Sequence, residues 1–409
     1  MSESRSLSGE ITPTSRAPWR RIAEAWAAGI SHGQLRLAFP DGSARVFVGA
    51  EPGPSAALQI NSPRAVRRMI LGGELGFAEA FMDGDWTTPD LTALVEFGLV
   101  NQESLDGPLR IALPMRIISA IRHRLNANTR RGAKRNIAYH YDLGNDFYSR
   151  WLDETMTYSS AIFEQPEMTL AAAQRAKYRK IIERLGLQPG DKVLEIGCGW
   201  GGFAEEAAKA GAEMTCLTIS QEQADYARKR MADAGLAEHV DIRLQDYRDV
   251  EGTFDRIVSI EMFEAVGEEN WPAYFDVVRD RLRAGGTAVL QIITIANERF
   301  AEYRRSVDFI QRYIFPGGML PSPATLADSI SAAGLKLAGS HFFALSYAET
   351  LKQWAERFME AWPDIERLGF DTRFQRMWRY YLAYCEAGFD AGRIDLLHLT
   401  LQRETQPRQ

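Results

Sequence analysis

The sequence Lys192-Val193-Leu194-Glu195-Ile196-Gly197-Cys198-Gly199-Trp200-Gly201-Gly202 decides how this chain folds. Its apolar first half predicts a short buried strand, and the glycines that follow predict a tight turn into a helix. Because Gly197, Gly199 and Gly201 carry no Cβ atom, a nucleoside can approach the backbone of the turn and the N-terminus of the next helix closely. The stretch therefore predicts a strand, a turn and a helix that together bind a ligand.

A carboxylate narrows the choice of ligand. A glycine-rich turn after a strand also occurs in dinucleotide-binding proteins, so the glycines alone are not specific. Here Glu195 stands two positions before the first glycine, at the end of the predicted strand. The pattern Glu-x-Gly-x-Gly-x-Gly resembles motif I of the class I S-adenosylmethionine (SAM) methyltransferases. The resemblance implies SAM as the cofactor, held by Glu195, Gly197, Gly199 and Gly201, and the alternative is a structural turn without a ligand.

Length and composition set limits for the whole chain. With 409 residues, 45% of them hydrophobic and 25% charged, we expect a soluble protein of two domains, or of one large domain with an appendage. There is no run of about 20 apolar residues and no signal peptide, and the three cysteines lack metal-like spacing, which together predict a cytoplasmic protein. A net charge of -6 argues against general nucleic-acid binding.

Three segments precede the catalytic domain. Residues 1–18 are polar and rich in Ser and Pro, which predicts a disordered tail. Residues 19–107 predict a small α+β domain with a β-hairpin, 34–39 and 44–48, and offer no candidate for chemistry. Residues 108–135 combine an apolar stretch with a dense basic run and predict an amphipathic linker. This linker either contacts an anionic membrane or is a solvated helix between domains.

Residues 136–409 predict the catalytic domain. Strands alternate with helices, which is typical of a doubly wound parallel sheet that binds its ligand at the carboxyl ends of the strands. An aromatic segment, 298–318, predicts a helical insertion that covers the site. A strand near 335–347 and two helices are expected to close the chain. The predicted strands before the insertion are 192–196, 213–218, 239–244, 254–260 and 286–295, and the predicted helices of the domain are 202–210, 220–234, 270–283, 348–366 and 372–389.

Two further strand ends carry polar groups suited to a nucleoside. The second strand is followed by Thr218, Ser220 and Gln223, which supply polar contacts where many methyltransferases place an acidic residue for the ribose. The third strand leads to Asp246, which is suited to accept from the adenine amino group, and to Tyr247, which is suited to cover the ring. We therefore assign these five residues to the cofactor site.

Carboxylates and a histidine are candidates for the chemistry itself. Glu261 and Glu264 follow the fourth strand, beside the predicted cofactor pocket. Glu264 has apolar neighbours and is expected to be a buried functional group, whereas Glu261 fits an exposed charge equally well. His140 is a candidate base near the transferred methyl group, or a partner in a structural hydrogen bond beside Asp142.

Several motifs together resemble the cyclopropane fatty acid synthase family, which includes the mycolic acid cyclopropane synthases and related methyl-branching enzymes. The resemblance covers residues 136 to about 390 and extends weakly over 20–130, as in the phospholipid-acting branch. Within these motifs we assign Tyr158 and Ser159 to cofactor binding. The motifs are Tyr139-His140-Tyr141-Asp142-Leu143-Gly144, Met156-Thr157-Tyr158-Ser159-Ser160-Ala161, Gly197-Cys198-Gly199-Trp200-Gly201-Gly202, Leu217-Thr218-Ile219-Ser220, Met262-Phe263-Glu264 and Phe309-Ile310-Gln311-Arg312-Tyr313-Ile314-Phe315-Pro316-Gly317-Gly318.

The resemblance implies a demanding reaction. The π electrons of a cis alkene in a lipid acyl chain attack the methyl group of SAM and leave a carbocation. Since an alkene is a poor nucleophile, alignment and exclusion of water must supply much of the rate. Aromatic faces stabilise a cation by about 0.5 to 2 kcal/mol each. We assign Tyr303, Tyr313 and Phe315 to the acyl tunnel, and the further aromatic candidates are Tyr139, Tyr148, Phe163 and Tyr347.

The predicted site departs from the family where the cation must lose a proton. The resemblance implies a bicarbonate base held by Cys, Glu, His and Tyr. At these positions stand Ser160, Glu264, Gln291 and Tyr347, so the thiol and the imidazole are replaced. Ser160 and Gln291 still offer hydrogen bonds to an anion or a water, so a bound base stays open. Altered placement of the base also favours a hydride shift before proton loss, and we expect a branched product.

These inferences combine into one hypothesis. We expect a class I SAM-methyltransferase fold, α/β with a Rossmann-like doubly wound sheet and a helical lid, plus a small α+β N-terminal domain. The protein would methylate the double bond of an unsaturated phospholipid acyl chain to give a methyl-branched or methylidene chain, peripherally at the inner face of a bacterial membrane and as a homodimer. The alternatives are a true cyclopropane synthase, a small-amine N-methyltransferase and a non-catalytic lipid-binding protein.

Overall fold

Alternating apolar residues build the first of two sheets. In a computed structural model, which describes residues 17–109 and 143–404, β1 (His32–Ala38) pairs antiparallel with β2 (Ala44–Val48). Leu35 and Leu37 on β1 are completely buried, while Arg36 between them is exposed. Gly42 takes a φ of 83° in the connecting turn, as a tight hairpin requires. The predicted hairpin is confirmed.

The rest of the N-terminal unit completes and covers this sheet. β3 (Glu51–Ile60) runs parallel to β1 and pairs with the short β4 (Trp86–Thr87), giving the order β2-β1-β3-β4. The helices are α1 (Pro18–Ala27), α2 (Pro63–Met82), α3 (Leu91–Val100) and α4 (Gln102–Leu109). Ser62 caps α2, and Gly73, with a φ of 55°, kinks it in the middle. Residues 63–82 therefore form one bent helix.

The second sheet has seven strands in the order β10-β11-β9-β8-β5-β6-β7. Its parallel part contains β5 (Lys192–Ile196), β6 (Glu213–Thr218), β7 (Val240–Leu244), β8 (Phe254–Ile260) and β9 (Leu282–Ile295). β5 lies between β6 and β8, where the strand order reverses, and a doubly wound sheet binds its ligand at such a point. The helices of this part are α8 (Leu170–Leu185), α9 (Gly202–Lys209), α10 (Gln221–Asp233), α11 (Trp271–Arg281) and α13 (Pro323–Ala332). The predicted Rossmann-like fold is confirmed.

One edge of this sheet differs from the prediction. β11 (Ile394–Gln402) pairs antiparallel with both β9 and β10 (Lys336–Phe342), so the sheet is mixed. We had expected two helices to close the chain, and that expectation was wrong because β11 follows them. The run Asp395-Leu396-Leu397-His398-Leu399 has no clear alternation, and such short apolar runs fit a helix or a strand equally well.

Short helical segments surround the carboxyl ends of the strands. The segment predicted as a helical insertion contains α12 (Asn297–Tyr303) and a π-helical turn, η4 (Ile310–Ile314), with a non-helical stretch between them. Three short 3-10 turns follow strands or precede α11: η1 (Tyr247–Asp249), η2 (Phe263–Ala265) and η3 (Glu268–Asn270). The insertion is therefore helical only in parts.

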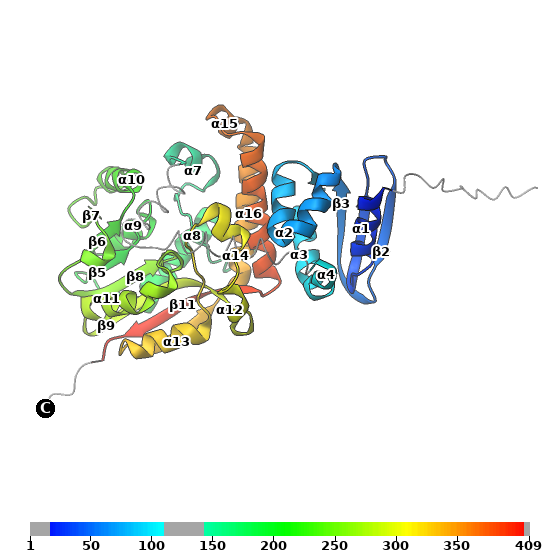
Figure 1. Cartoon of the computed structure of the whole chain (residues 1–409). Coiled ribbons are helices and arrows are strands. Elements are labelled where there is room, and N and C mark those ends of the chain that lie inside the picture. The colour runs from blue at the N-terminus through cyan, green and yellow to red at the C-terminus, as the bar shows by residue number, and fades with distance from the viewer. Residues whose placement is uncertain (1–16, 110–142, 405–409) are drawn as a thin grey trace, which may run out of the picture.

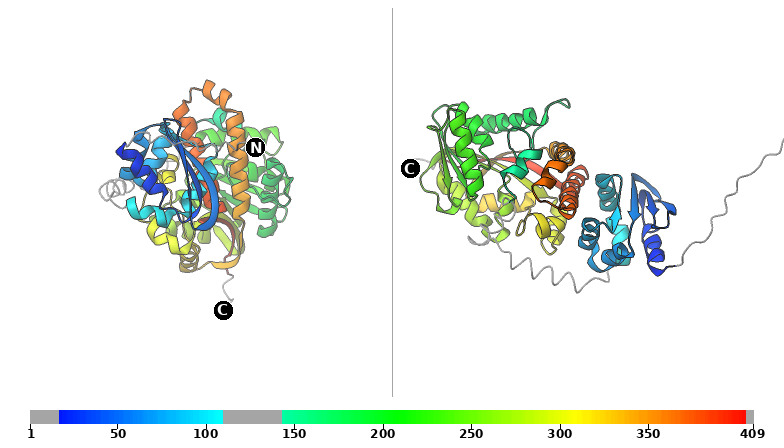
Figure 2. Two further views of the ribbon diagram at one scale, coloured as in Figure 1. Left: turned by 90° about the vertical axis from the view of Figure 1, so that its right-hand side faces the viewer. Right: turned by 90° about the horizontal axis from the view of Figure 1, so that it is seen from above.

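A layer of helices joins the two sheets. Its members are α7 (Asn145–Trp151), α14 (Ala344–Glu360), α15 (Trp362–Arg367) and α16 (Thr372–Asp390). Figure 1 shows α14 and α16 standing between the large sheet and the N-terminal unit. Figure 2, seen from above, shows the same order of layers. Aromatic rings fill this layer: Phe147 lies edge-on to Trp378, with 5.1 Å between ring centroids.

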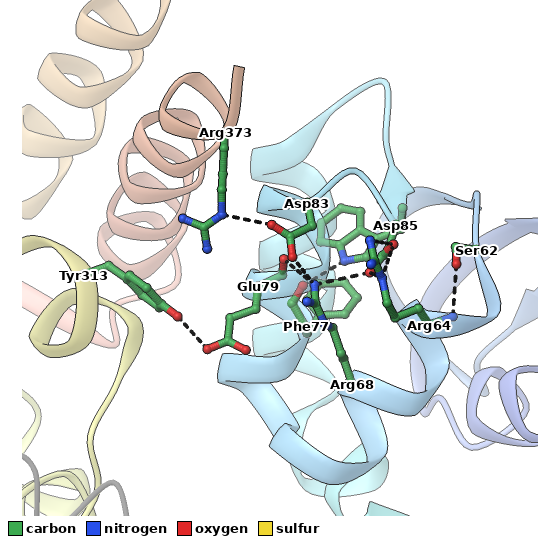
Figure 3. Close-up of polar contacts among 10 residues, drawn as sticks. Ser62, Arg64, Arg68, Phe77, Glu79, Asp83, Asp85, Tyr313 and Arg373 are labelled. Atoms are coloured by element: carbon green, nitrogen blue, oxygen red, sulfur yellow. Dashed lines mark hydrogen bonds and ion pairs between the residues drawn. The ribbon is translucent and has the colours of Figure 1, made fainter. Parts of the chain in front are cut away.

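Polar contacts connect the N-terminal unit to the rest of the chain (Figure 3). The Tyr313 hydroxyl donates to Glu79 Oε1 at 2.5 Å, and Arg373 Nε lies 2.9 Å from Asp83 Oδ1. Apolar contact accompanies them, since Phe81 of α2 lies 5.9 Å from Tyr380 of α16 between ring centroids. One continuous core of buried residues therefore runs from α1 to β11.

Some predictions fall outside the described residues. These are the tail up to residue 16, the basic linker from residue 110 onward, and His140 and Tyr139. Within residues 17–109 and 143–404, no helix has both the length and the apolar character needed to span a bilayer.

Candidate active site

The glycine-rich turn lies at the carboxyl end of β5 and shapes a cradle. Gly197, Gly199 and Gly201 take φ values of 84°, 52° and 81°, a region that L side chains rarely adopt. A Cβ atom at Gly197 would lie 2.8 Å from Met262 Cγ, so the close approach of the two loops also requires glycine there. The turn leads into α9 and lines a cavity of about 930 Å³. These residues fit a nucleoside cofactor held against bare backbone.

Glu195 lies beneath this turn, at the end of β5. Its carboxylate accepts a weak hydrogen bond from the Cys216 thiol at 3.5 Å, and burial raises its pKa to about 8. The residue is almost completely buried, yet it contributes to the cavity wall. It is therefore placed to bind the polar part of a ligand, as the sequence pattern predicted.

The polar residues after β6 divide into two groups. Thr218 and Gln223 line the cavity, and their side chains are linked by a 2.8 Å hydrogen bond from Thr218 Oγ1 to Gln223 Oε1. The Ser220 hydroxyl instead caps α10 by accepting from the Gln223 backbone N–H. Thr218 and Gln223 remain candidates for contact with a ribose, whereas Ser220 acts through the start of the helix.

Asp246 and Tyr247 line the cavity after β7. Asp246 forms an ion pair with Arg248 at 2.6 Å and also accepts from the Arg248 backbone N–H. The Tyr247 ring packs edge-on against Tyr274, with 5.4 Å between centroids, and burial raises the pKa of its hydroxyl to about 12. The arrangement provides a flat aromatic face and a fixed carboxylate, which is the pair predicted for an adenine.

Tyr158 and Ser159 also contribute to the cavity wall. The Tyr158 hydroxyl donates to Tyr381 at 2.9 Å, and the Ser159 hydroxyl accepts from Lys177 Nζ at 2.7 Å. Lys177 itself is completely buried, and burial lowers its pKa to about 7 against the opposing effect of nearby carboxylates, Glu261 first among them. A buried lysine therefore lies behind the cavity wall, against Ser159, and it was not among the residues predicted from the sequence.

Glu261 is the centre of the hydrogen-bond network at the site. Its Oε1 atom accepts from the Ser160 backbone N–H at 2.9 Å and from Gln291 Nε2 at 2.6 Å. Its Oε2 atom accepts from the Tyr347 hydroxyl at 2.6 Å. The sequence left Glu261 open between an exposed charge and a functional group, and the structure places it at the meeting point of Ser160, Gln291 and Tyr347. The Ser160 hydroxyl turns away and donates to Ala161 O, so only its amide serves the network.

A second chain of hydrogen bonds orients Gln291. Arg184 contacts His398 Nδ1, and His398 Nε2 lies 2.7 Å from Gln291 Oε1. Since burial and the nearby Arg184 hold the pKa of His398 well below its usual range, the ring is neutral and carries its proton on Nε2. The Gln291 amide must therefore present its oxygen to His398 and its NH₂ group to Glu261.

Glu264, the predicted anion ligand, lies near Glu261 but shares no hydrogen bond with this network among the described residues. Its Oε1 atom accepts from the Ile293 backbone N–H at 2.5 Å, and within the described residues its buried Oε2 atom has no hydrogen-bond partner. Burial, reinforced by the charge of Glu261, raises its pKa to about 8. Glu264 still lines the cavity and is mainly protonated at neutral pH, so it is placed to donate rather than to bind an anion.

The predicted tunnel residues are only partly in the cavity wall. Tyr303 and Phe315 line it, and the Tyr303 hydroxyl accepts from Gln311 Nε2 and from the Leu320 N–H, both at 3.3 Å. Tyr313 instead points to α2 and binds Glu79 (Figure 3). The N-terminal unit supplies apolar wall that the sequence did not predict, from Met69, Leu75, Phe77, Leu94, Phe97 and Gly98. The cavity is therefore shared between both parts of the chain.

The sequence contains a pattern that marks Lys177, which was not predicted as a site residue. Along α8 the buried positions follow helical spacing, and Lys177 falls on this buried face with Ala173 and Ile181. A charged residue on an apolar helix face requires a partner, so the spacing marks Lys177 as unusual. His398 and the cavity wall of the N-terminal unit gave no comparable signal, because both depend on packing between distant segments.

Comparisons with known proteins show the family to which the chain is similar. A family model described as mycolic acid cyclopropane synthetase matches residues 128–399. The tuberculostearic acid methyltransferase UfaA1 of Mycobacterium tuberculosis is 42% identical over 408 residues, which cover 98% of this chain and 94% of that protein. The cyclopropane-fatty-acyl-phospholipid synthase of Escherichia coli K12 is 39% identical over 354 residues, covering 85% of this chain and 88% of that protein.

A solved structure of a mycolic acid cyclopropane synthase is also similar to this chain. The mycolic acid cyclopropane synthase CmaA1, complexed with SAH and CTAB, superposes with a TM-score of 0.62 at 33% identity. The superposition covers 66% of this chain and 98% of that one. The family match spans the residues of the glycine cradle and of the network around Glu261.

Proposed function

This chain belongs to the mycolic acid cyclopropane synthetase family of SAM-dependent enzymes, and we propose that it methylates the double bond of an unsaturated phospholipid acyl chain. The product we propose is a methyl-branched chain that carries a methylidene group. The family match and the relatives support the reaction class, and UfaA1 and the phospholipid synthase of E. coli, by their names, act on fatty acyl substrates. The choice of product comes from the residues around Glu261.

One observation carries the proposal. A single cavity of about 930 Å³ begins at the glycine cradle, passes Glu261 and Glu264, and reaches the apolar wall of α2 and α3. A site for SAM and a small polar amine would not need an apolar extension into a second unit. An acyl chain does, because its methylene groups gain free energy when they leave water, by about 0.8 kcal/mol each. The shape therefore favours a long apolar substrate that meets the cofactor near the two carboxyl groups.

The residues of the chain have separate tasks in the reaction. SAM, when bound, supplies an electrophilic methyl group. The glycine cradle, Glu195 and Tyr247 hold the cofactor, and the apolar wall aligns the alkene with it and excludes water. Aromatic side chains in the wall, among them Tyr303 and Phe315, stabilise the positive charge that then forms on the acyl chain.

The balance of bonds gives the product. After methyl transfer, one carbon of the former double bond carries the new methyl group and the other carries the charge. A hydride shift from the methylated carbon to its neighbour moves the charge to the methylated carbon. Loss of a proton from the methyl group then forms the methylidene double bond, whereas loss of that proton without a shift closes a cyclopropane ring. The timing of proton removal therefore decides between the two products.

Two guanidinium groups support a phospholipid as the substrate. Arg299 and Arg393 both line the cavity, and both donate to Gln102 Oε1 of α4, at 3.0 and 3.2 Å. Among the described residues, neither arginine forms an ion pair with a carboxylate. Arg393 also donates to the Leu99 carbonyl oxygen, so the acceptors of both guanidinium groups are neutral. Two cations with neutral acceptors are suited to a phosphodiester. Arg299→Ala should raise KM for phospholipid vesicles by about tenfold, as expected for one lost charge-assisted bond, and leave KM for SAM unchanged.

Membrane docking and dimerisation belong to the same proposal. Val46 and Val48 on the edge strand β2 are 59% and 73% exposed, and they offer apolar contact to a bilayer surface. The homodimer is proposed from the family resemblance. Co-sedimentation with vesicles of anionic and of neutral phospholipids tests the first statement, and light scattering after gel filtration tests the second.

The product is tested by mass spectrometry of fatty acids from a bacterial host that expresses the protein. Released fatty acids should gain one carbon, and hydrogenation before analysis should convert the new species to a methyl-branched chain. Gly197→Val is the matched inactive control, because its side chain would clash with Met262 and strain a left-handed φ. No gain of carbon with the wild-type protein refutes the reaction, and a cyclopropane chain refutes the proposed product.

A further inference from the structure

The donors predicted to hold an external base already hold a side chain. Ser160, Gln291 and Tyr347 were expected to bind bicarbonate, and in the structure the Ser160 amide, Gln291 Nε2 and the Tyr347 hydroxyl all donate to Glu261. Glu264, the fourth expected ligand, lies beside Glu261 and is itself a carboxyl group. A bicarbonate ion would have to displace Glu261 and lie beside acidic groups. The residues present therefore do not fit bicarbonate.

The backbone at Glu261 is held in a strained conformation. Its φ is 49°, and among the described residues Met156 is the other non-glycine residue with a positive φ. A left-handed conformation at such a residue costs about 1 kcal/mol or more, and residues of this kind concentrate at active sites. Glu261 and Met156 both line the cavity. The strain turns the carboxylate of Glu261 toward Ser160, Gln291 and Tyr347, and these three contacts offset the cost.

Burial raises the pKa of Glu261, whereas its contacts favour the ionised form. All three partners are placed as donors, and a carboxylate accepts such bonds, whereas a protonated carboxyl group would need an acceptor for its own proton. The buried ammonium of Lys177 adds an attractive charge, which opposes the effect of burial. Among residues 17–109 and 143–404, Oε1 accepts two bonds and Oε2 accepts one, which leaves one lone pair of Oε2 without a donor, and Glu261 lines the cavity.

We propose that Glu261 is the base of the reaction, and that this enzyme carries in its own chain the carboxylate for which the family resemblance implies a bound bicarbonate ion. The inference rests on the proposed function. In the final step a C–H bond of the transferred methyl group breaks, its electron pair forms the methylidene double bond, and the proton moves to Glu261 Oε2. Glu261 becomes a neutral carboxylic acid and returns the proton to solvent after the product leaves.

A fixed base also accounts for the branched product. The carboxylate is tethered through its own side chain and held by three donors, so it cannot follow the methyl group as a small ion can. Each donor also withdraws electron density from the oxygen atoms and weakens the base. Slower proton removal gives the hydride shift time to occur, and the charge then lies on the more substituted carbon before the proton leaves.

Direct binding of bicarbonate tests the inference without any turnover. The ¹³C NMR signal of labelled bicarbonate is followed with the wild-type protein and with Glu261→Gly. Glycine suits the left-handed φ of this position, so the variant should fold, and its melting temperature and affinity for S-adenosylhomocysteine verify that it does. The wild-type protein should leave the signal unchanged, and the variant should broaden or shift it. A signal that broadens or shifts with the wild-type protein would mean that its site binds bicarbonate although Glu261 is present, and this result would overturn the inference.

Activity in carbonate-free buffer gives an independent test. Wild-type methyl transfer to vesicles of a monounsaturated phospholipid should change less than about twofold on addition of bicarbonate. Glu261→Gln keeps the size of the side chain but not the base, and should lose about 10²- to 10⁴-fold in kcat with unchanged affinity for S-adenosylhomocysteine. Glu251→Gln, a matched change at an exposed position, should have wild-type activity.

The Glu261→Gly variant allows a third test, rescue of activity by bicarbonate. Bicarbonate should restore part of its activity, because the three donors are then free to hold the ion. A Glu261→Gln variant with more than half of the wild-type kcat, or a wild-type enzyme that depends on bicarbonate, overturns the inference. A wild-type enzyme that transfers no methyl group refutes the proposed function instead, while the NMR experiment still decides which group occupies the site.

Discussion

Removing the buried charge of Lys177 should move the pH dependence of the reaction. Lys177→Met keeps a long unbranched side chain at a completely buried position and removes only the ammonium group. The carboxylate of Glu261 then loses its nearest attractive charge, so its pKa should rise. Because the proposed base works only as a carboxylate, the acidic limb of the activity profile should move to higher pH.

The structure sets the size of this shift. Lys177 Nζ binds the Ser159 hydroxyl at 2.7 Å, and the amide of the next residue, Ser160, binds Glu261 at 2.9 Å. Two unit charges separated by roughly 8 Å at an effective dielectric constant of about 20 interact by about 2 kcal/mol, which corresponds to about 1.5 pKa units. Burial lowers the pKa of Lys177 to about 7, so the lysine is charged below that pH and the effect should appear on the part of the acidic limb below pH 7.

The assay is kcat/KM for methyl transfer to phospholipid vesicles between about pH 5 and pH 9, in buffers of constant ionic strength. Lys180→Met is the matched control, because Lys180 lies on the same helix with a 40% exposed side chain and an exposed ion pair of little energetic value. Its profile should coincide with that of the wild type. An active Lys177→Met enzyme with an unmoved acidic limb, or with a limb moved to lower pH, would refute the reasoning that Lys177 supports the base.

Three further perturbations test other parts of the structure. Glu264→Gln should have a higher melting temperature than the wild type at pH 8.5 but not at pH 4. Burial raises the pKa of Glu264 in the folded protein to about 8, so the stability that its proton contributes is fully present below the unfolded value of 4.5 and is lost as pH rises through 8. His398→Leu should lower kcat about tenfold without changing the affinity for S-adenosylhomocysteine, because the Gln291 amide is then free to turn its oxygen to Glu261, and an equal loss of both would contradict this. Tyr313→Phe should lower the free energy of unfolding by about 1 kcal/mol in urea titrations, and should have a smaller effect when Glu79→Gln already weakens the contact.

Local patterns in the sequence were sufficient for the fold and the cofactor cradle. The Glu-x-Gly-x-Gly-x-Gly pattern from Glu195 to Gly201 predicts both the turn and its ligand, because each of the three glycines has a positive φ that L side chains rarely adopt. Regular alternation of strands and helices then gave the parallel part of the sheet. β11 was not predicted because a short apolar run has no distinctive period. Its antiparallel place between β9 and β10 depends on pairing with strands from which α14, α15 and α16 separate it in the sequence.

The arrangement around the two glutamates was not predictable in the same way. Glu261 and Glu264 lie three residues apart after one strand, and either could face the donors on β9 and α14. The choice depends on the φ of 49° at Glu261, which no local sequence pattern requires. The sequence also does not predict which residues of α2 and α3 line the cavity, because this depends on how α16 packs against both helices.

The two glutamates divide one negative charge between them. Burial raises the pKa of both groups, but Glu261 accepts three hydrogen bonds that favour its ionised form, while Glu264 accepts one and has a pKa raised to about 8, so Glu261 is the better placed of the two to carry the charge. A single negative charge beside the reacting alkene stabilises the cation that forms there. A second negative charge would repel the first and raise the pKa of both carboxyl groups. When Glu261 takes the proton, the pair becomes neutral at the moment when the product becomes neutral too. With Glu261 as the base and Glu264 protonated, the charge of the site thus follows the charge of the substrate through the reaction.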